Sequence, residues 1–213
     1  MRILAVADVH GKRDRLETIR QNIATYQPNL LVIAGDLLSR KMAGQVEALL
    51  ASISLPIFLV KGNADSSFFA GMIDRNPNCT DLHLNRSVML DTPFIGVGGA
   101  VPIPFYAKVH WFEQKVLEKL SRLLSAESII VTHTPPRGSC DKVLKRFHAG
   151  SKALGNLIDR VRPKLVICGH IHENSGVEYR GDTCVVNCSM GDGGRGFLID
   201  LGPGKERITA TGL

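Results

Sequence analysis

The sequence has 213 residues, of which 44% are apolar and 22% charged, and its formal net charge is +6 at pH 7. This composition is typical of a folded globular protein and excludes a disordered chain, and no stretch approaches the roughly 20 apolar residues of a membrane span. Because Asp8 interrupts the first apolar run too early for a signal peptide, we expect a cytoplasmic protein, with residues 1–213 forming a single domain. The positive charge favours anionic partners, and nucleic acid is compatible with it but not required.

The first predicted strand is the apolar run that starts at Arg2 and ends at Asp8 and His10. Residues two apart on an extended backbone project to the same side, so both side chains could hold one cation. Apolar residues at helical spacing then predict a helix that starts near Asp14 and stops before Pro28.

Four more apolar runs of strand length end in polar residues of the same kind. Because a strand, a helix and a strand form a right-handed parallel unit, the carboxyl ends of such strands meet at one edge of a sheet. We therefore expect Asp8, His10 and Asp36 to be neighbours. The four runs are Leu30–Ala34 before Gly35-Asp36, Ile57–Val60 before Gly62-Asn63, Ser128–Thr132 before His133, and Lys164–Cys168 before Gly169-His170-Ile171-His172.

The remaining pattern predicts a second, partly antiparallel sheet. Short extended pieces between residues 77 and 97, separated by turn-forming residues, indicate where it starts. Residues 134–150 are too polar for a core element, and the glycine-rich residues 189–196 are expected to be a turn between strands, because no helix follows them. The other predicted elements are helices at 44–52, within 111–124 and at 151–161, and strands at 81–84, 87–90, 93–97, 176–179, 183–187, 196–201 and 208–211, with a hairpin turn at 202–205.

The five cysteines form no C-x-x-C pair, and their number is odd, so we expect reduced thiols. Cys168 and Cys184 lie within apolar strand patterns and are expected to be small buried side chains.

The candidate ligands suit a first-row divalent metal. Carboxylate and amide oxygens combined with imidazoles favour Mn²⁺, Fe²⁺ or Zn²⁺ over a thiolate zinc site or an all-oxygen calcium site. Seven ligands are too many for one tetrahedral ion, whereas two ions about 3.5–4 Å apart, which a carboxylate can bridge, are suited to attack on phosphorus. The seven are Asp8, His10, Asp36, Asn63, His133, His170 and His172.

Taken in order, these motifs resemble the calcineurin-like metallophosphoesterase superfamily, and in particular its phosphodiesterase-like branch, over residues 8–172. The resemblance implies an α/β fold, a four-layer αββα sandwich of two mixed β-sheets flanked by helices. It implies two divalent ions, with Mn²⁺ favoured and Fe²⁺/Fe³⁺, Zn²⁺, Ni²⁺ or Mg²⁺ as alternatives. By the same resemblance Asp8, His10 and His172 hold one ion, Asn63, His133 and His170 hold the other, and Asp36 bridges them.

The activity implied by this resemblance is metal-dependent hydrolysis of a phosphoester by in-line attack of a metal-bound hydroxide, with catalytic roles for Asp36 and Asn63. We expect a phosphodiesterase that acts on a phosphorylated small molecule or a nucleotide. A phosphomonoesterase, a protein phosphatase and a metal-binding scaffold with little catalysis remain alternatives. The sequence specifies neither the physiological substrate nor the oligomeric state.

One departure from the family pattern concerns Gly62-Asn63-Ala64-Asp65, where the family commonly has Gly-Asn-His followed by Asp or Glu. That histidine lies near the leaving-group oxygen and acts as a general acid or stabilises the phosphate, and alanine can do neither. Without a histidine to orient, Asp65 is expected to be a turn residue or the N-cap of a following helix.

His148 is a candidate replacement for the missing acid. It lies in a cationic stretch, residues 137–152, which is either a solvated face or a rim that contacts the substrate, and it precedes Gly150 and Ser151, a favourable N-cap. We hypothesise that His148 is catalytic; the alternative is a structural or exposed role. His83 and His110 match no ligand position and are expected to be structural or at the surface.

Overall fold

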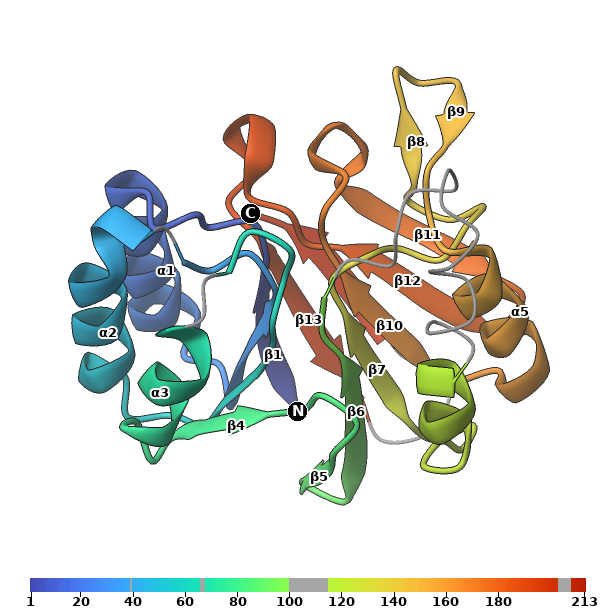
Figure 1. Ribbon diagram of the computed structural model, residues 1–213, viewed down its shortest axis with the longest axis horizontal. Coiled ribbons are helices and arrows are strands. Elements are labelled where there is room, and N and C mark those ends of the chain that lie inside the picture. The colour runs from blue at the N-terminus through green and yellow to red at the C-terminus, as the bar shows by residue number, and fades with distance from the viewer. Residues whose placement is uncertain (39, 66–67, 100–114, 203–207) are drawn as a thin grey trace.

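The computed structural model describes residues 1–38, 40–65, 68–99, 115–202 and 208–213. Its strands form two six-stranded mixed sheets that pack face to face, and helices cover both outer faces (Figure 1). The expected α/β sandwich of four layers is confirmed.

The first sheet has the strand order β14-β13-β1-β2-β3-β4. β1 to β4 are parallel, and β13 and β14 extend this sheet with antiparallel pairing. The strand bounds are β1 Arg2–Val6, β2 Leu30–Ala34, β3 Ile57–Val60, β4 Cys79–Asp81, β13 Phe197–Leu201 and β14 Ile208–Gly212.

The second sheet has the strand order β11-β12-β10-β7-β6-β5. Its four central strands are parallel, and its two edge strands, β11 and β5, are antiparallel to their neighbours. The strand bounds are β5 Arg86–Met89, β6 Thr92–Val97, β7 Ile129–Thr132, β10 Leu165–Cys168, β11 Gly176–Arg180 and β12 Thr183–Asn187.

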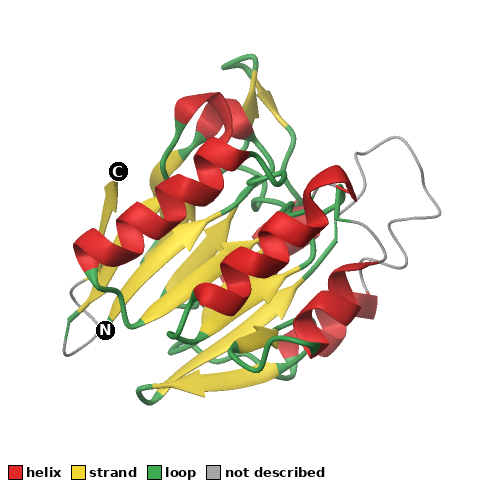
Figure 2. Ribbon diagram, turned by 90° about the vertical axis from the view of Figure 1, so that its left-hand side faces the viewer, coloured by secondary structure: helices red, strands yellow, loops and turns green. Residues whose placement is uncertain are grey.

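Helices α1 (Arg13–Tyr26), α2 (Ala43–Ser52) and α3 (Phe68–Asp74) cover the first sheet, as Figure 2 shows from the helix side. Helix α5 (Lys152–Val161) and the helical residues 115–121 cover the second sheet. The described residues also contain three short 3₁₀ segments, namely η1 (Arg40–Met42), η2 (His172–Asn174) and η3 (Gly191–Gly193).

The alternation of side chains along the central strands explains the four layers. In β1, Ile3 and Ala5 belong to the apolar cluster between the sheets, whereas Leu4 and Val6 pack against the helices. Because successive strand residues face opposite sides, a strand that is apolar at every position needs cover on both faces. The continuous apolar runs in the sequence therefore require both a second sheet and a helix layer.

The prediction for residues 77–97 was partly wrong. The β5–β6 pair is antiparallel as expected, but β4 is parallel to β3 and belongs to the first sheet. The residues after β4 bond to both sheets, because Leu82 N–H donates to the Leu59 carbonyl (2.9 Å) and the Leu82 carbonyl accepts from Gly96 N–H (3.0 Å). Residues 82–84 therefore connect the sheets instead of extending one of them.

Residues 134–150 also differ from the expectation. They contain a short hairpin, β8 (Lys142–Val143) and β9 (Phe147–His148), and they contribute Cys140 to the core beneath α5. Within the predicted helix at 111–124, residues 111–114 lie outside the described residues, as do residues 203–205 of the predicted turn and His110.

All five cysteines are free, and Cys168 and Cys184 are buried in the core as predicted. Burial raises the pKa of the Cys79 thiol to about 11 and that of Cys140 to about 12, so these thiols remain protonated at neutral pH. Among the described residues, no helix combines the length and the apolar character needed to cross a bilayer. The cytoplasmic location stays a prediction.

Candidate metal centre

The parallel strands deliver all seven predicted ligands to one edge of the two sheets. Asp8 and His10 follow β1, Asp36 follows β2 and Asn63 follows β3, all from the first sheet. From the second sheet, His133 follows β7, and His170 and His172 follow β10. The expectation that Asp8, His10 and Asp36 are neighbours is confirmed by the contacts described below.

A first group consists of Asp8, His10 and His172, whose potential ligand atoms all lie within 4.8 Å of one another. Asp8 is fully buried, and its Oδ1 has no hydrogen-bond partner among the described residues. His172 Nε2 lies 3.3 Å from this oxygen. A buried carboxylate oxygen that accepts no hydrogen bond is costly, and a cation held between this oxygen and His172 would remove that cost.

A second group surrounds Nε2 of His133. The other ring nitrogen, Nδ1, donates to the carbonyl of Ala34 (2.9 Å), so the neutral ring presents the Nε2 lone pair to the site. Three further potential ligand atoms lie close to this nitrogen, namely Asn63 Oδ1 at 3.0 Å, His170 Nδ1 at 3.2 Å and Asp36 Oδ2 at 3.4 Å. These oxygen and nitrogen atoms carry lone pairs and converge on one point, where the hydrogen-bond donors of the described residues are too few to satisfy each of them. Such an arrangement fits a bound cation.

Asp36 lies between the two groups. Its Oδ2 is 3.9 Å from His10 Nε2 and 3.4 Å from His133 Nε2. Its other oxygen, Oδ1, accepts a hydrogen bond from the N–H of Ala64 (2.7 Å). One carboxylate oxygen is therefore held in place, and the other faces histidines of both groups.

The protonation states suit a divalent cation. Burial acts to raise the pKa of Asp8 and of Asp36, but the imidazoles of His172 and His133 outweigh it, and the pKa of each carboxyl lies below its usual value. Burial lowers the pKa of His10 and of His170, whereas, against burial, the carboxylate of Asp36 raises the pKa of His133 and that of Asp8 raises the pKa of His172. A bound cation would displace the proton from the latter two rings. Charged carboxylates and neutral imidazoles are the forms that bind metals.

The backbone at the site is strained. Four predicted ligands adopt the left-handed conformation, with φ of 57° at Asp8, 52° at His10, 51° at Asp36 and 72° at His170. Such a conformation costs about 1–3 kcal/mol for a residue with a side chain and clusters at functional sites. Hydrogen bonds hold it here, because the Arg15 guanidinium donates to the Asp8 carbonyl and His170 N–H donates to Asp8 Oδ2 (2.9 Å).

A model of calcineurin-like phosphoesterases matches residues 1–174 of the chain. The chain belongs to the calcineurin-like phosphoesterase family. An uncharacterised protein of Methanocaldococcus jannaschii, MJ1162, is 28% identical over 200 residues, which cover 89% of this chain and 88% of the relative.

The fold also resembles solved structures. TT1561 of Thermus thermophilus has a TM-score of 0.70 at 20% identity, with 99% of this chain and 98% of that chain covered. A structure described as a novel archaeal phosphodiesterase has a TM-score of 0.55 at 15% identity, with both chains covered completely. At these identities the likeness concerns the fold alone.

Two glycines at this edge of the sheets leave room for the predicted ligands. A Cβ at Gly62 would collide with the Asp36 side chain, and a Cβ at Gly191 would collide with the His172 ring. Gly191 belongs to η3, within the segment that was expected to be a turn between strands. This turn, as predicted, joins β12 and β13, but it also forms a wall of the site.

Asp65 has a role that the sequence analysis did not identify. Its two oxygens accept hydrogen bonds from Leu38 N–H and Gly62 N–H, both at 2.7 Å, and it is buried. Both donors lie outside α3, and residues 66–67, which would be capped in the expected arrangement, lie outside the described residues. The carboxylate ties the turn after β2 to the turn after β3, and these turns carry Asp36 and Asn63.

We expect Asp65→Ala to lower the free energy of unfolding by about 2–6 kcal/mol, because two buried N–H groups lose their acceptor at about 1–3 kcal/mol each. Urea unfolding in the presence of a chelator measures this without a contribution from metals. The exposed Asp74, changed to Ala, is the matched control, with an expected change within about 0.5 kcal/mol. Equal stability of the two variants would contradict this role.

Asn187 is a second organising residue that the sequence analysis missed. It is buried at the end of β12, and its amide donates to the carbonyls of Ile171 (2.8 Å) and Asn174 (3.1 Å) on either side of His172. Its position was the available signal, because a polar residue directly after an apolar strand is the pattern that identified the ligands. Arg15 carried no comparable signal.

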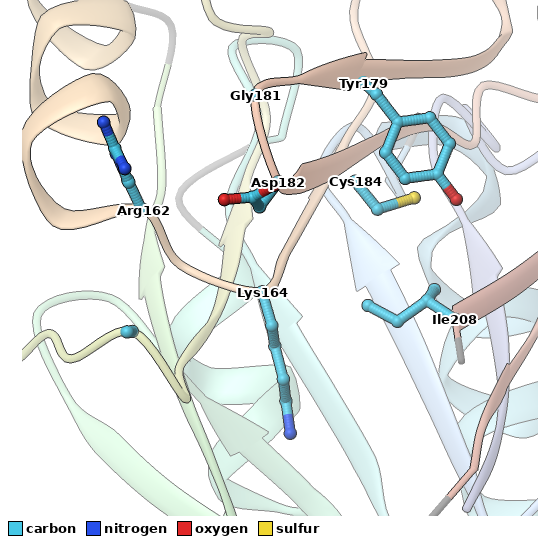
Figure 3. A pocket seen from close by; sticks show the side chains of 8 residues that line it. Arg162, Lys164, Tyr179, Gly181, Asp182, Cys184 and Ile208 are labelled. Carbon is cyan, nitrogen blue, oxygen red and sulfur yellow. The ribbon is translucent and has the colours of Figure 1, made fainter. Parts of the chain in front are cut away.

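A separate hollow of about 600 Å³ lies at the opposite edge of the second sheet, where β10 and β12 begin (Figure 3). Figure 3 shows the side chains of Arg162 and Lys164 extending in different directions, so they do not converge on one ligand. The predicted ligands follow the other ends of the strands, and this hollow is not part of the metal centre.

Proposed function

We propose that this chain is a metal-dependent phosphoester hydrolase that acts best on phosphodiesters of small molecules or nucleotides. The observation that carries the proposal is the buried Asp8 Oδ1, which has no hydrogen-bond partner among the described residues and lies beside two histidine groups. Two further observations support the proposal: the chain belongs to the calcineurin-like phosphoesterase family, and the seven candidate ligands follow strands that end at one edge of the two sheets.

In this proposal Asp8, His10 and His172 hold one divalent ion, and Asn63, His133 and His170 hold the other. Asp36 would hold both ions, because its Oδ2 faces histidines of both groups. When bound, two such ions, with Mn²⁺ favoured, supply positive charge to the phosphoryl oxygens and lower the pKa of water.

The residues around the ions keep the ligands in position. Ala34 accepts the Nδ1 hydrogen of His133 and so maintains the tautomer that binds metal. Ala64 N–H holds Asp36 by its Oδ1, and the absence of a side chain at Gly62 lets Asp36 approach. With alanine at position 64, substrates whose leaving group needs no proton are favoured, which is the reason for preferring activated diesters.

Removal of metal tests this proposal. Protein dialysed against a chelator is expected to lose hydrolysis of bis(4-nitrophenyl) phosphate and to regain it with Mn²⁺, and 4-nitrophenyl phosphate is expected to be the poorer substrate. Full turnover by metal-free protein would refute the metal dependence. A preference for the monoester would instead favour a phosphomonoesterase.

We also propose that His148 donates a proton to the leaving group. Its Nδ1 donates to Asp141 Oδ1 (2.6 Å), and Asp141 is fully buried and accepts Gly150 N–H at its other oxygen (2.9 Å). The ring is therefore oriented and its Nε2 is left for another contact. The same hairpin contributes Val143 to a hollow of about 370 Å³ that includes His170 and His172.

His148→Ala is expected to slow hydrolysis of a diester with an alkyl leaving group by about 10²-fold and to change the rate with a nitrophenyl leaving group by less than about threefold. The pH–rate profiles of both substrates measure this. His148→Gln, which keeps the size of the side chain but transfers no proton, should behave like the alanine variant. Parent-like rates on both substrates would exclude the role.

A further inference from the structure

We propose that Lys61 and His83 form a subsite that binds a non-bridging phosphoryl oxygen of the substrate beside Asn63. This subsite would supply the phosphate stabilisation that the family obtains from the histidine absent at position 64. The inference rests on the proposed function, and it concerns the side of the site away from His148.

The two side chains share a hollow with a predicted metal ligand. A hollow of about 420 Å³ at this edge of the sheets is lined by Lys61, Asn63 and His83, together with Gly98 and Gly99. Asp65 and Asp81 also line it, and both oxygens of Asp65 already accept backbone N–H groups. His83 is exposed, and Lys61 is partly exposed. Both can therefore reach a ligand that enters beside Asn63.

The bridging segment explains why a histidine distant in sequence lies here. Leu82 is bonded to both β3 and β6, and Leu84 N–H donates to the Gly96 carbonyl (2.9 Å). The residue between them, His83, is held at the seam of the two sheets. β3 and β6 both end at this edge, so His83 lies near the residues that follow both strands.

The position of the ring hydrogen is set by the backbone. Gly98 N–H donates to His83 Nδ1 (3.0 Å), so the neutral ring carries its hydrogen on Nε2. No described residue accepts that hydrogen. One oxygen of the Asp81 carboxylate, Oδ1, accepts the backbone N–H of His83 (2.9 Å). The Nε2 hydrogen is therefore a fixed donor available to a ligand.

Lys61 adds a positive charge to the same hollow. Gly99 N–H donates to the Lys61 carbonyl (2.6 Å), and a Cβ at Gly98 would lie 2.9 Å from the backbone nitrogen of Lys61. The residues that follow β3 and β6 are therefore in close contact. Lys61 makes no ion pair with any residue that the structure describes. A cation and an N–H donor beside a metal ligand match an oxygen of a phosphoryl group, whether in a phosphoester or in free phosphate.

The test separates this role from folding and from proton transfer. His83→Asn can keep the acceptor for Gly98 N–H but lacks the Nε2 hydrogen, whereas His83→Gln can place an N–H donor near the original position. In metal-loaded protein we expect His83→Asn and Lys61→Met to lower kcat/KM by about 10–100-fold, equally for nitrophenyl and alkyl leaving groups. His83→Gln should recover part of this loss. Lys164→Met, at the opposite edge, is the matched control and should leave the rate unchanged.

Phosphate binding provides a readout that does not depend on turnover. Inorganic phosphate added to metal-loaded parent protein should shift the imidazole NMR signals of His83, and its dissociation constant should rise by about 10-fold or more in His83→Asn. Unchanged phosphate affinity in both His83→Asn and Lys61→Met would overturn the subsite. A loss confined to alkyl leaving groups would overturn it as well, since it would make His83 a proton donor. If the parent binds phosphate in this way but hydrolyses no phosphoester, the subsite stands and the proposed hydrolysis fails.

Discussion

Asp36→Asn is expected to lower kcat/KM by about 10²–10⁴-fold, more than the replacement of any one histidine of the site. Removal of one partner from a buried charged cluster costs about 3–5 kcal/mol, and each 1.36 kcal/mol corresponds to a factor of ten in rate. Asp36 is 3% exposed, and its Oδ2 faces histidines of both groups, so the substitution weakens both metal positions at once. A histidine variant weakens one position.

Asp200→Asn is the matched control for this substitution. Asp200 is a half-exposed carboxylate paired with Arg2 on the first sheet, so the control removes the same charge away from the site. Rates are compared on bis(4-nitrophenyl) phosphate at saturating Mn²⁺. If Asp36→Asn turned over like the control, the assignment of Asp36 to both ions would be wrong.

The second large effect concerns the leaving group of the parent protein. Without a histidine at position 64, we expect kcat/KM for diesters to fall steeply as the leaving group becomes more basic. A positioned general acid contributes about 10²–10⁴-fold to the rate. With alkyl leaving groups the rate should fall by this full factor if His148 does not act as the acid, and by less if it does. A series of methyl aryl phosphates with leaving phenols of increasing pKa measures this slope. A flat dependence would mean that an efficient acid is present.

Ala64→His tests the same point from the other direction, but the structure limits how much it can restore. Ala64 is exposed beside Asp36, so an imidazole has room there. Asp65, which could orient that imidazole, already accepts Leu38 N–H and Gly62 N–H with its two oxygens. We therefore expect kcat/KM to depend less steeply on the leaving-group pKa in Ala64→His than in the parent. The dependence should still be steeper than in an enzyme whose general acid is fully oriented.

The convergence of the seven candidate ligands on one edge could be predicted from the sequence because each one follows an apolar run of strand length. Parallel strands bring their carboxyl ends to one edge, so the order of the chain was sufficient to group Asp8, His10 and Asp36. The layers could be predicted for a related reason, since β2 and β3 are apolar at every position and need cover on both faces.

The misassigned features depend on contacts between distant parts of the chain. Whether residues 82–84 extend a sheet or join two sheets depends on their bonds to Leu59 and Gly96, which no local pattern indicates. His83 is exposed, as expected, but its place in the hollow that Asn63 also lines follows from that arrangement and was not predicted. Likewise, Asp65 is an ordinary turn residue in sequence, and its two acceptor bonds exist only because the turns after β2 and β3 are adjacent.

The left-handed backbone at Asp8, His10, Asp36 and His170 was also beyond prediction from sequence. Glycine is the usual residue for this conformation. Aspartate and histidine adopt it more often than most other side chains do, but most aspartates and histidines have other backbone conformations, so the residue type alone does not predict it. The strain is held by tertiary bonds such as the one from Arg15 to the Asp8 carbonyl. A sequence motif can therefore identify these candidate ligands without indicating the backbone conformation that orients their side chains.

Metal content tests the central claim most directly. Parent protein stripped with a chelator, reloaded with excess Mn²⁺ and freed of unbound metal should contain two ions per chain by elemental mass spectrometry. Asp36→Asn treated in the same way should contain fewer, and Asp200→Asn should match the parent. A parent content of one ion or none would contradict the dinuclear site formed by Asp8, Asp36, Asn63 and the four histidines.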